Sequence, residues 1–225
     1  MVGQPVSRRE RYRAETREEA KGIALRQLAE GGTGAVSLNA IGKEMGITGP
    51  ALYRYFASRD ALLTEIIIDA YSDLAAATEV VAARQGDDVA PQERLRALAE
   101  VIRAWALTQP HRYLLLYGTP VPGYVAPDDT VPLARRVLVP FLDALSALPV
   151  MGAIPGSRLA VLEAQLATWV RATDPHMVGP VFRRGLVWWT RLHGLISLEV
   201  EGHFASMGFD PALLYDTEID ALLDG

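Results

Sequence analysis

Apolar residues recur every three to four positions along most of the chain, with polar residues between them. This spacing places the apolar side chains on one face of an α-helix. The strict alternation of apolar and polar residues that is typical of a half-buried strand does not occur in the sequence. The pattern therefore predicts an all-α fold of about ten helices. We expect a short helix after Thr48 and helices over 7–29, 38–45, 59–83, 91–108, 111–117, 131–148, 157–172, 179–207 and 211–223.

Two short helices joined at a glycine are predicted in the first third of the chain. Ser37 is a suitable N-cap for the first, because its hydroxyl can accept from a backbone N–H that has no partner inside the helix. Gly46 stands where the chain needs a left-handed residue to end that helix. Thr48 then caps the second helix, in which Leu52 and Phe56 face inward. This is the arrangement of a helix-turn-helix, which presents one helix to the major groove of DNA.

The same stretch resembles the N-terminal domain of TetR-type transcriptional regulators. The family has Lys where Arg59 stands, and Arg keeps the charge. The resemblance covers about residues 10–66. It implies a three-helix DNA-binding domain at 1–66 and a larger helical ligand-binding and dimerisation domain at 67–225. The matching positions are Ser37, Gly46-Ile47-Thr48, Leu52-Tyr53-Arg54-Tyr55-Phe56, Arg59 and Leu62-Leu63.

The resemblance also implies which residues meet DNA. Phosphate contacts set the position of such a domain, and base contacts set its sequence preference. The second short helix has few long polar side chains, so we expect reading by Arg54, Thr48, apolar contacts to thymine methyl groups, and DNA shape. Two alternatives stay open: Tyr53 covers a hydrophobic edge, or Arg54 is a solvated charge. The implied DNA-binding residues are Ser37, Thr48, Gly49, Pro50, Ala51, Tyr53, Arg54, Tyr55 and Arg59.

Composition and charge narrow the class of protein. Half of the 225 residues are apolar, as in a globular protein. There is no cysteine, so disulfides and thiol nucleophiles are excluded. The sequence has neither an apolar run of the roughly 18 residues that a membrane span needs nor a signal peptide, so we expect a cytoplasmic protein. Residues 1–60 hold 10 Lys and Arg against 7 Asp and Glu and carry +3, whereas residues 61–225 hold 12 against 20 and carry −8. The basic part is the part that resembles a DNA-binding domain.

A second resemblance lies in the C-terminal part. Residues 109–113 and 116–120, with Trp189, His193 and Gly194 downstream, resemble one subgroup of TetR regulators with a Trp-His-Gly type of C-terminal domain. Members of the family bind a small molecule in this domain. Mostly apolar walls with a few polar tips favour a largely hydrophobic effector. The alternative is that these aromatic side chains are ordinary core. The candidate ligand-binding residues are Trp105, Tyr113, Tyr117, Phe141, Leu145, Trp169 and His193.

A homodimer is the expected assembly, because two reading heads about 34 Å apart reach successive major grooves of a near-palindrome. The helices around 158–171 and 179–207 are the predicted partner face, with Trp188 as an anchor. Gly185 and Gly194 would permit close approach there, or else pack within one subunit.

The sequence thus predicts a ligand-responsive repressor that binds a palindromic operator as a homodimer. An activator or a ligand-dependent corepressor-type regulator of the same fold is the first alternative. A helical interaction module and a metal-dependent enzyme are the non-regulatory alternatives. The enzyme rests on Glu199 and His203 alone, which stand four residues apart as metal ligands on one helical face would. We expect no catalytic residue, no metal and no cofactor.

Overall fold

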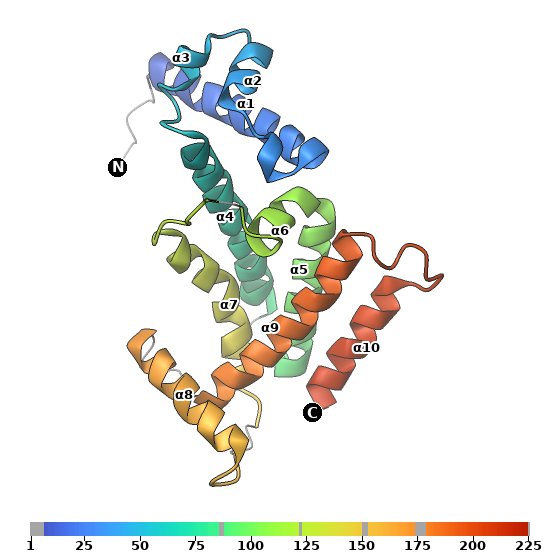
Figure 1. Cartoon of the computed structure of the whole chain (residues 1–225). Coiled ribbons are helices and arrows are strands. Elements are labelled where there is room, and N and C mark those ends of the chain that lie inside the picture. Colours follow the sequence, from blue (N-terminus) through green and yellow to red (C-terminus); the bar gives the residue numbers. More distant parts are fainter. Residues whose placement is uncertain (1–6, 86–87, 122, 150–152, 174–178, 225) are drawn as a thin grey trace. The chain divides into compact units, whose positions relative to one another are not determined.

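The computed structural model describes residues 7–85, 88–121, 123–149, 153–173 and 179–224, and for 169–173 it describes the backbone alone. Over these residues the fold is all-helical, as predicted (Figure 1). A 3-10 turn, η1, spans Thr33–Ala35. The α-helices are α1 (Arg8–Gly31), α2 (Leu38–Glu44), α3 (Gly49–Leu52), α4 (Arg59–Gln85), α5 (Pro91–Thr108), α6 (Pro110–Tyr117), α7 (Thr130–Ser146), α8 (Arg158–Thr173), α9 (Gly179–Val200) and α10 (Pro211–Asp224).

The chain forms two compact units. The first comprises Met1–Tyr71 and Gln109–Thr130, and the second comprises Ser72–Thr108 and Val131–Gly225. The division falls within α4. The first unit has its own core, since α1, α2, α3 and the first turns of α4 bury their apolar faces together. The buried members of this core are Ala20, Ile23, Ala24, Leu28, Val36, Leu38, Ile41, Leu52, Phe56, Leu62, Leu63, Ile66 and Val121.

Ion pairs hold α1 to α4 beside that core. The guanidinium of Arg17 lies 4.7 Å from the centre of the Phe56 ring and pairs with Glu65. It also donates to the backbone oxygen of Tyr55 at 2.6 Å. One turn further along α1, Lys21 pairs with Asp69. These pairs fix the register of α1 against α4, because the partners repeat every four residues on both helices.

Helix α6 belongs to the first unit. Its Tyr113 is fully buried, and the ring centre of Tyr113 lies 5.3 Å from that of Tyr117. Tyr117 in turn meets the edge of Tyr71 at 6.1 Å. The hydroxyl of Tyr124 lies 3.0 Å from that of Thr64. The predicted domain boundary after residue 66 stays a prediction. The contacts group α6 and the loop that follows it with the helix-turn-helix.

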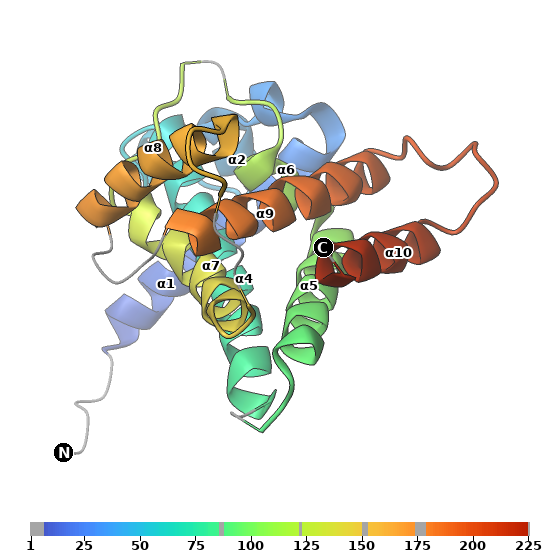
Figure 2. The same cartoon turned by 90° about the horizontal axis from the view of Figure 1, so that it is seen from below.

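In the second unit α9 packs against α8, α10 and α5 (Figure 2). The hydroxyl of Tyr215 donates to the backbone oxygen of Ala99 at 2.8 Å, which ties α10 to α5. Arg103 of α5 pairs with Glu199 of α9, with an Nε–Oε2 distance of 2.8 Å. The buried apolar side chains of this unit include Leu95, Leu98, Ile102, Val137, Phe141, Leu145, Trp188, Leu192, Ile196 and Ile219.

Two expectations about α9 are wrong. The helix ends at Val200 and not near residue 207, because the chain turns there and Gly202 takes a φ of +79° that continues no right-handed helix. Trp188 cannot anchor a partner from the surface, since 1% of it is exposed in the single chain. Gly185 packs within the subunit: a Cβ there would stand 2.6 Å from Cδ2 of Leu142.

Candidate nucleic-acid interface

The turn between α2 and α3 has the predicted stereochemistry. The Ser37 hydroxyl accepts from the backbone N–H of Ala40 at 3.4 Å and so caps α2. Gly46 has a φ of +69°, the left-handed conformation that ends the helix. The N–H of Ile47 then donates to the oxygen of Gly42 at 2.9 Å. These bonds satisfy the last carbonyls of α2 and redirect the chain into α3.

Helix α3 is a single turn that buries one side and leaves the other open. Leu52 and Phe56 are 0% and 1% exposed, which confirms that they face the core. Tyr53, by contrast, is 49% exposed. The backbone after α3 continues as a tight turn, in which the N–H of Tyr55 donates to the oxygen of Leu52 at 2.9 Å. The candidate residues that are exposed are Thr48, Pro50, Tyr53 and Arg54, and those that are half-buried are Ser37, Gly49, Ala51, Tyr55 and Arg59.

Thr48 occupies the N-cap position, but its hydroxyl makes no capping hydrogen bond. An exposed hydroxyl in this place can donate to a phosphate or a base edge, because α3 does not require it. The backbone N–H of Ala51 is already used within α3, because it donates to the backbone oxygen of Thr48 at 2.9 Å. Thr48 is therefore the most available hydrogen-bonding side chain at the start of α3.

Two residues that sequence reasoning missed lie where α2 and α3 meet. A Cβ on Gly49 would stand 2.6 Å from Oδ1 of Asn39, whereas a Cβ on Gly42 would stand in ordinary contact, 3.7 Å from Cα of Gly49. Asn39 thus lies tightly against the start of α3, and Gly42 lies next to it. The available signal was the pair Gly42 and Gly46, one helical turn apart just before the predicted turn.

Arg59 lies at the start of α4, and its guanidinium reaches the backbone ahead of α2. Its Nε donates to the oxygen of Val36 at 3.2 Å, and Nη2 donates to the oxygen of Thr33. Nη1 lies 3.6 Å from Oδ1 of Asp60. Two nitrogens of this side chain therefore donate to backbone oxygens, the third faces a carboxylate, and the side chain braces η1 against α4.

The start of α1 adds exposed positive charge. Ser7 and Glu10 form a capping box, in which the Ser7 N–H donates to Oε2 of Glu10 at 2.9 Å. The backbone hydrogen bond from Ser7 holds the pKa of the Glu10 carboxyl below its usual value. This cap fixes the first turn of α1. Four arginines follow it on the exposed part of the helix: Arg8, Arg9, Arg11 and Arg13.

The candidate ligand-binding residues fall in both units. Tyr113 and Tyr117 belong to the first unit, where they contact each other. Trp105, Phe141, Leu145 and His193 belong to the second, and the Trp169 side chain lies outside the described residues. The Trp105 indole donates to Oδ2 of Asp73 at 2.9 Å, while Phe141 and Leu145 are buried. The assignment of these residues to one ligand site stays a prediction.

His193 lies largely buried in α9, one turn after Trp189. Their ring centres are 3.9 Å apart. Burial disfavours the charged imidazolium and lowers the pKa of His193 to about 4. The side chain is therefore neutral at physiological pH.

The predicted pair of metal ligands has other partners. Glu199 holds Arg103, as described above, and His203 lies 3.2 Å from Oε2 of Glu201. Among the described residues, no group of three or more His, Cys, Asp and Glu side chains lies close enough to hold a metal ion. No helix in this same part of the chain combines the length and the hydropathy needed to cross a bilayer.

Comparison with known proteins gives matches along nearly the whole chain. Residues 23–66 match the family described as "Bacterial regulatory proteins, tetR family", and residues 95–222 match "Tetracyclin repressor-like, C-terminal domain". The HTH-type transcriptional regulator Rv1816 of Mycobacterium tuberculosis is 38% identical over 221 residues, which cover 91% of this chain and 90% of that protein. The solved structure of the protein SCO4313 is 43% identical, with a TM-score of 0.84, and the match covers 97% of this chain and 100% of that one. FadR of Bacillus subtilis, solved in complex with stearoyl-CoA, shares the fold alone, with 11% identity, a TM-score of 0.54 and coverage of 91% and 96%.

Proposed function

The chain belongs to the TetR family of bacterial regulatory proteins, and we propose that it represses transcription by binding a palindromic operator as a homodimer that a small molecule releases. As a transcriptional regulator of this family it acts on DNA. The observation that carries the finer proposal is the exposed face of the helix-turn-helix. Its core residues are buried, while Thr48, Tyr53 and Arg54 are exposed to solvent. The arginines at the start of α1, in the same unit, are exposed as well.

We assign the DNA contacts in three groups. The first group begins α3 and approaches base edges; it comprises Thr48, Gly49, Pro50 and Ala51. Ser37 approaches the DNA backbone from the start of α2. Tyr53 and Tyr55 approach phosphates next to α3. Arg54 supplies the long cationic side chain that can reach a guanine or a phosphate. Arg59 is assigned near the DNA backbone as well. Its hydrogen bonds to the protein backbone at Thr33 and Val36 also hold the start of α4 in place.

The homodimer is supported by exposed apolar side chains on α8 and α9. Soluble monomers seldom expose large contiguous apolar surfaces, and such surfaces mark interfaces. A stable dimer of this kind buries about 1,200–2,000 Å² in total. We expect Val161→Glu to convert the protein from twice its 24.5 kDa mass to the single-chain mass in sedimentation. The exposed apolar residues of the two helices include Leu159, Val161, Leu162, Leu186 and Leu198.

The effector is proposed to be small and largely hydrophobic, bound in the C-terminal domain. FadR of Bacillus subtilis, which shares the fold, was solved with stearoyl-CoA. An effector releases the operator only if it prefers the conformation that binds DNA poorly. The regulator would then work in the cytoplasm, where both DNA and effector are present.

A mobility shift with the DNA upstream of the protein's own gene tests the proposal. The complex should weaken steeply with salt, because lysine and arginine contacts release condensed counterions. Arg54→Gln should lower the slope of log K against log salt by about 0.9 if the side chain neutralises one phosphate. Arg84→Gln, an exposed arginine in the second unit, is the matched control and should leave the slope unchanged. Absence of a shift with any genomic fragment at low salt would refute DNA regulation by this protein.

The sign of regulation needs its own experiment. If the gene is deleted and reporter expression from the bound promoter falls, the protein is the alternative activator. If the shift appears only with a small molecule added, it is a corepressor-type regulator. The interaction module without regulated DNA binding predicts that the unchanged protein shifts no fragment in preference to unrelated DNA.

A further inference from the structure

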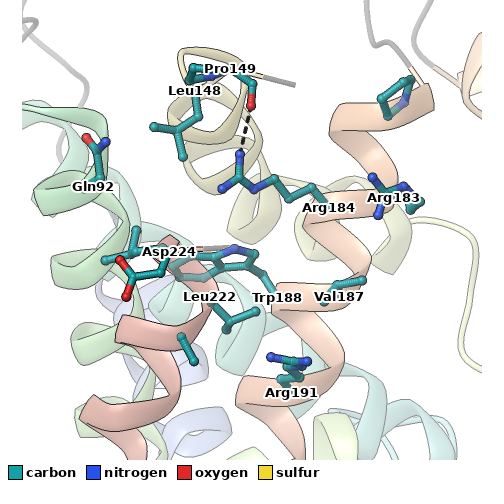
Figure 3. Close-up of a pocket in the computed structure, with 13 residues that line it drawn as sticks. Gln92, Leu148, Pro149, Arg183, Arg184, Val187, Trp188, Arg191, Leu222 and Asp224 are labelled. Carbon is teal, nitrogen blue, oxygen red and sulfur yellow. Dashed lines mark hydrogen bonds between the residues drawn. The ribbon is translucent and has the colours of Figure 1, made fainter. Parts of the chain in front are cut away.

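A hollow in the second unit lies where the ends of four helices meet. Its volume is about 550 Å³, and its walls come from the start of α5, the first half of α9, the end of α10 and residues 148–149, which follow α7 (Figure 3). Small-molecule sites are usually about 300–1,000 Å³. Of the candidate ligand-binding residues whose side chains the structure describes, none lines this hollow. It is therefore a separate place in the fold from the one that the sequence predicted.

Three arginines of α9 line the hollow, and they differ in their partners. Arg183 donates to Oε1 of Glu163 at 2.9 Å, and Arg191 donates to Oε1 of Glu218 at 2.8 Å. Arg184 pairs with no carboxylate in the described part of the chain. Its Nη1 donates to the backbone oxygen of Pro149 at 3.3 Å.

The Arg184 side chain crosses the hollow from α9 to the residues that follow α7 (Figure 3). A guanidinium has five N–H donors in a planar fork that matches a carboxylate or a phosphate. One neutral acceptor at 3.3 Å leaves most of these donors to solvent or to a ligand. Arg184 is thus a positive charge that the described residues do not neutralise.

The Trp188 side chain closes the same wall from below Arg184. It is 1% exposed, and its Nε1 is buried with no hydrogen-bond acceptor among the described residues. In Figure 3 the Arg184 side chain extends from α9 toward Pro149, whereas the Trp188 ring extends from α9 toward Asp224. Trp188 therefore contributes buried aromatic surface, and Arg184 contributes the accessible donors of this wall.

The remaining lining is mostly apolar, with one opposing charge. Leu148, Val187 and Leu222 provide carbon surface next to Arg184 and Trp188. Asp224, at the end of α10, is the one carboxylate among the described lining residues, and it is exposed. A ligand that matches this lining has an apolar body and a single anionic head.

We propose that this hollow binds an organic anion, whose carboxylate or phosphate accepts from Arg184 and whose apolar body packs on Leu148, Val187 and Leu222. The proposal rests on the proposed function only where it makes this anion an effector that changes operator affinity. Binding itself is a property of the second unit and is measured without DNA.

Isothermal titration of the full-length protein with octanoate, octyl phosphate and 1-octanol tests the proposal. One of the two anions should bind, and comparison of the two identifies the preferred head group. The neutral 1-octanol should bind at least about tenfold more weakly than that anion, because hydrogen bonds to a charged group contribute about 1.5–3 kcal/mol. Arg184→Gln should weaken anion binding by the same factor of about ten or more and leave 1-octanol unchanged.

Two further variants fix the place and the sign of the charge effect. Asp224→Asn should tighten anion binding about twofold, since it removes a like charge across a solvated gap. Arg84→Gln, away from the hollow, should change nothing. The proposal is overturned if neither anion binds, if 1-octanol binds as well as the anions, or if Arg184→Gln binds the anion like the unchanged protein. A protein that binds octanoate here but shifts no DNA would keep this site and lose the proposed function.

Discussion

Replacement of Gly46 by alanine tests the stereochemistry on which the reading head depends. Gly46 has a φ of +69°, and a Cβ built on it would meet no atom within 4 Å. The substitution therefore causes no clash, and its effect comes from the backbone conformation alone. A left-handed conformation costs a residue with a Cβ about 1–2 kcal/mol. We expect Gly46→Ala to destabilise the helix-turn-helix by that amount.

Gly22→Ala is the matched control in the same unit. Gly22 lies inside α1, its φ is that of an ordinary helix, and a Cβ there would also meet no atom within 4 Å. Alanine in a helix interior stabilises by about 0.5–1 kcal/mol relative to glycine. The same chemical change in equally open space should thus have opposite signs at the two positions.

Amide hydrogen exchange is the appropriate assay, because it reports the opening of each segment separately. The N–H of Ile47, which donates to Gly42, should exchange about five- to thirtyfold faster in Gly46→Ala. All four tryptophans of the chain belong to the second unit, so unfolding followed by tryptophan fluorescence should not change. If Gly46→Ala instead slows exchange, as Gly22→Ala should, the left-handed turn is absent and the reasoning fails.

Three other experiments test the electrostatics of the fold. Because His193 stays neutral in the native state down to a pKa of about 4, the unfolded chain binds a proton first as the pH falls. The free energy of unfolding should therefore drop between pH 6.5 and 4, by at most about 3 kcal/mol. In His193→Gln, unfolding followed by tryptophan fluorescence should show a smaller drop over this pH range. An equal drop in the variant would assign the pH dependence to other groups. Arg103→Met should cost about 3 kcal/mol in denaturant unfolding, since it strands the largely buried Glu199 carboxylate, and adding Glu199→Leu should recover most of that loss. Arg59→Lys keeps the charge but loses the paired donors, so exchange at the backbone that Arg59 braces should quicken while the salt slope of DNA binding stays the same; unchanged exchange would refute the bracing role.

The helix-turn-helix could be predicted because its determinants are local. The cap at Ser37, the left-handed Gly46 and the inward pair Leu52 and Phe56 all act within 20 residues of one another. Each determinant has a physical cause that a single sequence displays: a side-chain acceptor, a permitted φ, or a four-residue spacing. The structure adds the close contact of Gly49 in α3 with Asn39 in α2, which is visible only once both helices are placed.

The packing of the longer helices could not be predicted in this way. Helical spacing tells which face of a helix is apolar, but it does not tell which neighbour covers that face. The sequence pattern groups Tyr113 and Tyr117 with Trp105 as ligand candidates. In the structure the Tyr117 ring contacts those of Tyr113 and Tyr71, and all three belong to the first unit. The expectation that Trp188 lies at a partner surface is wrong for the same reason. An aromatic residue on an apolar helix face gives the same sequence pattern whether its own chain or a partner chain covers it.

The net charge counted from the sequence does not show which cations are available to bind DNA. The count of +3 for residues 1–60 treats each cation as available. Arg17 and Lys21 are paired with Glu65 and Asp69, which lie beyond residue 60 and enter no such count. Among the described residues, the charge that can release counterions from DNA is therefore concentrated in the exposed cations outside these pairs, which include Lys43, Arg54 and the arginines at the start of α1. Since a paired cation must first give up its carboxylate, the salt dependence of operator binding should follow these exposed cations and not the total charge of the domain.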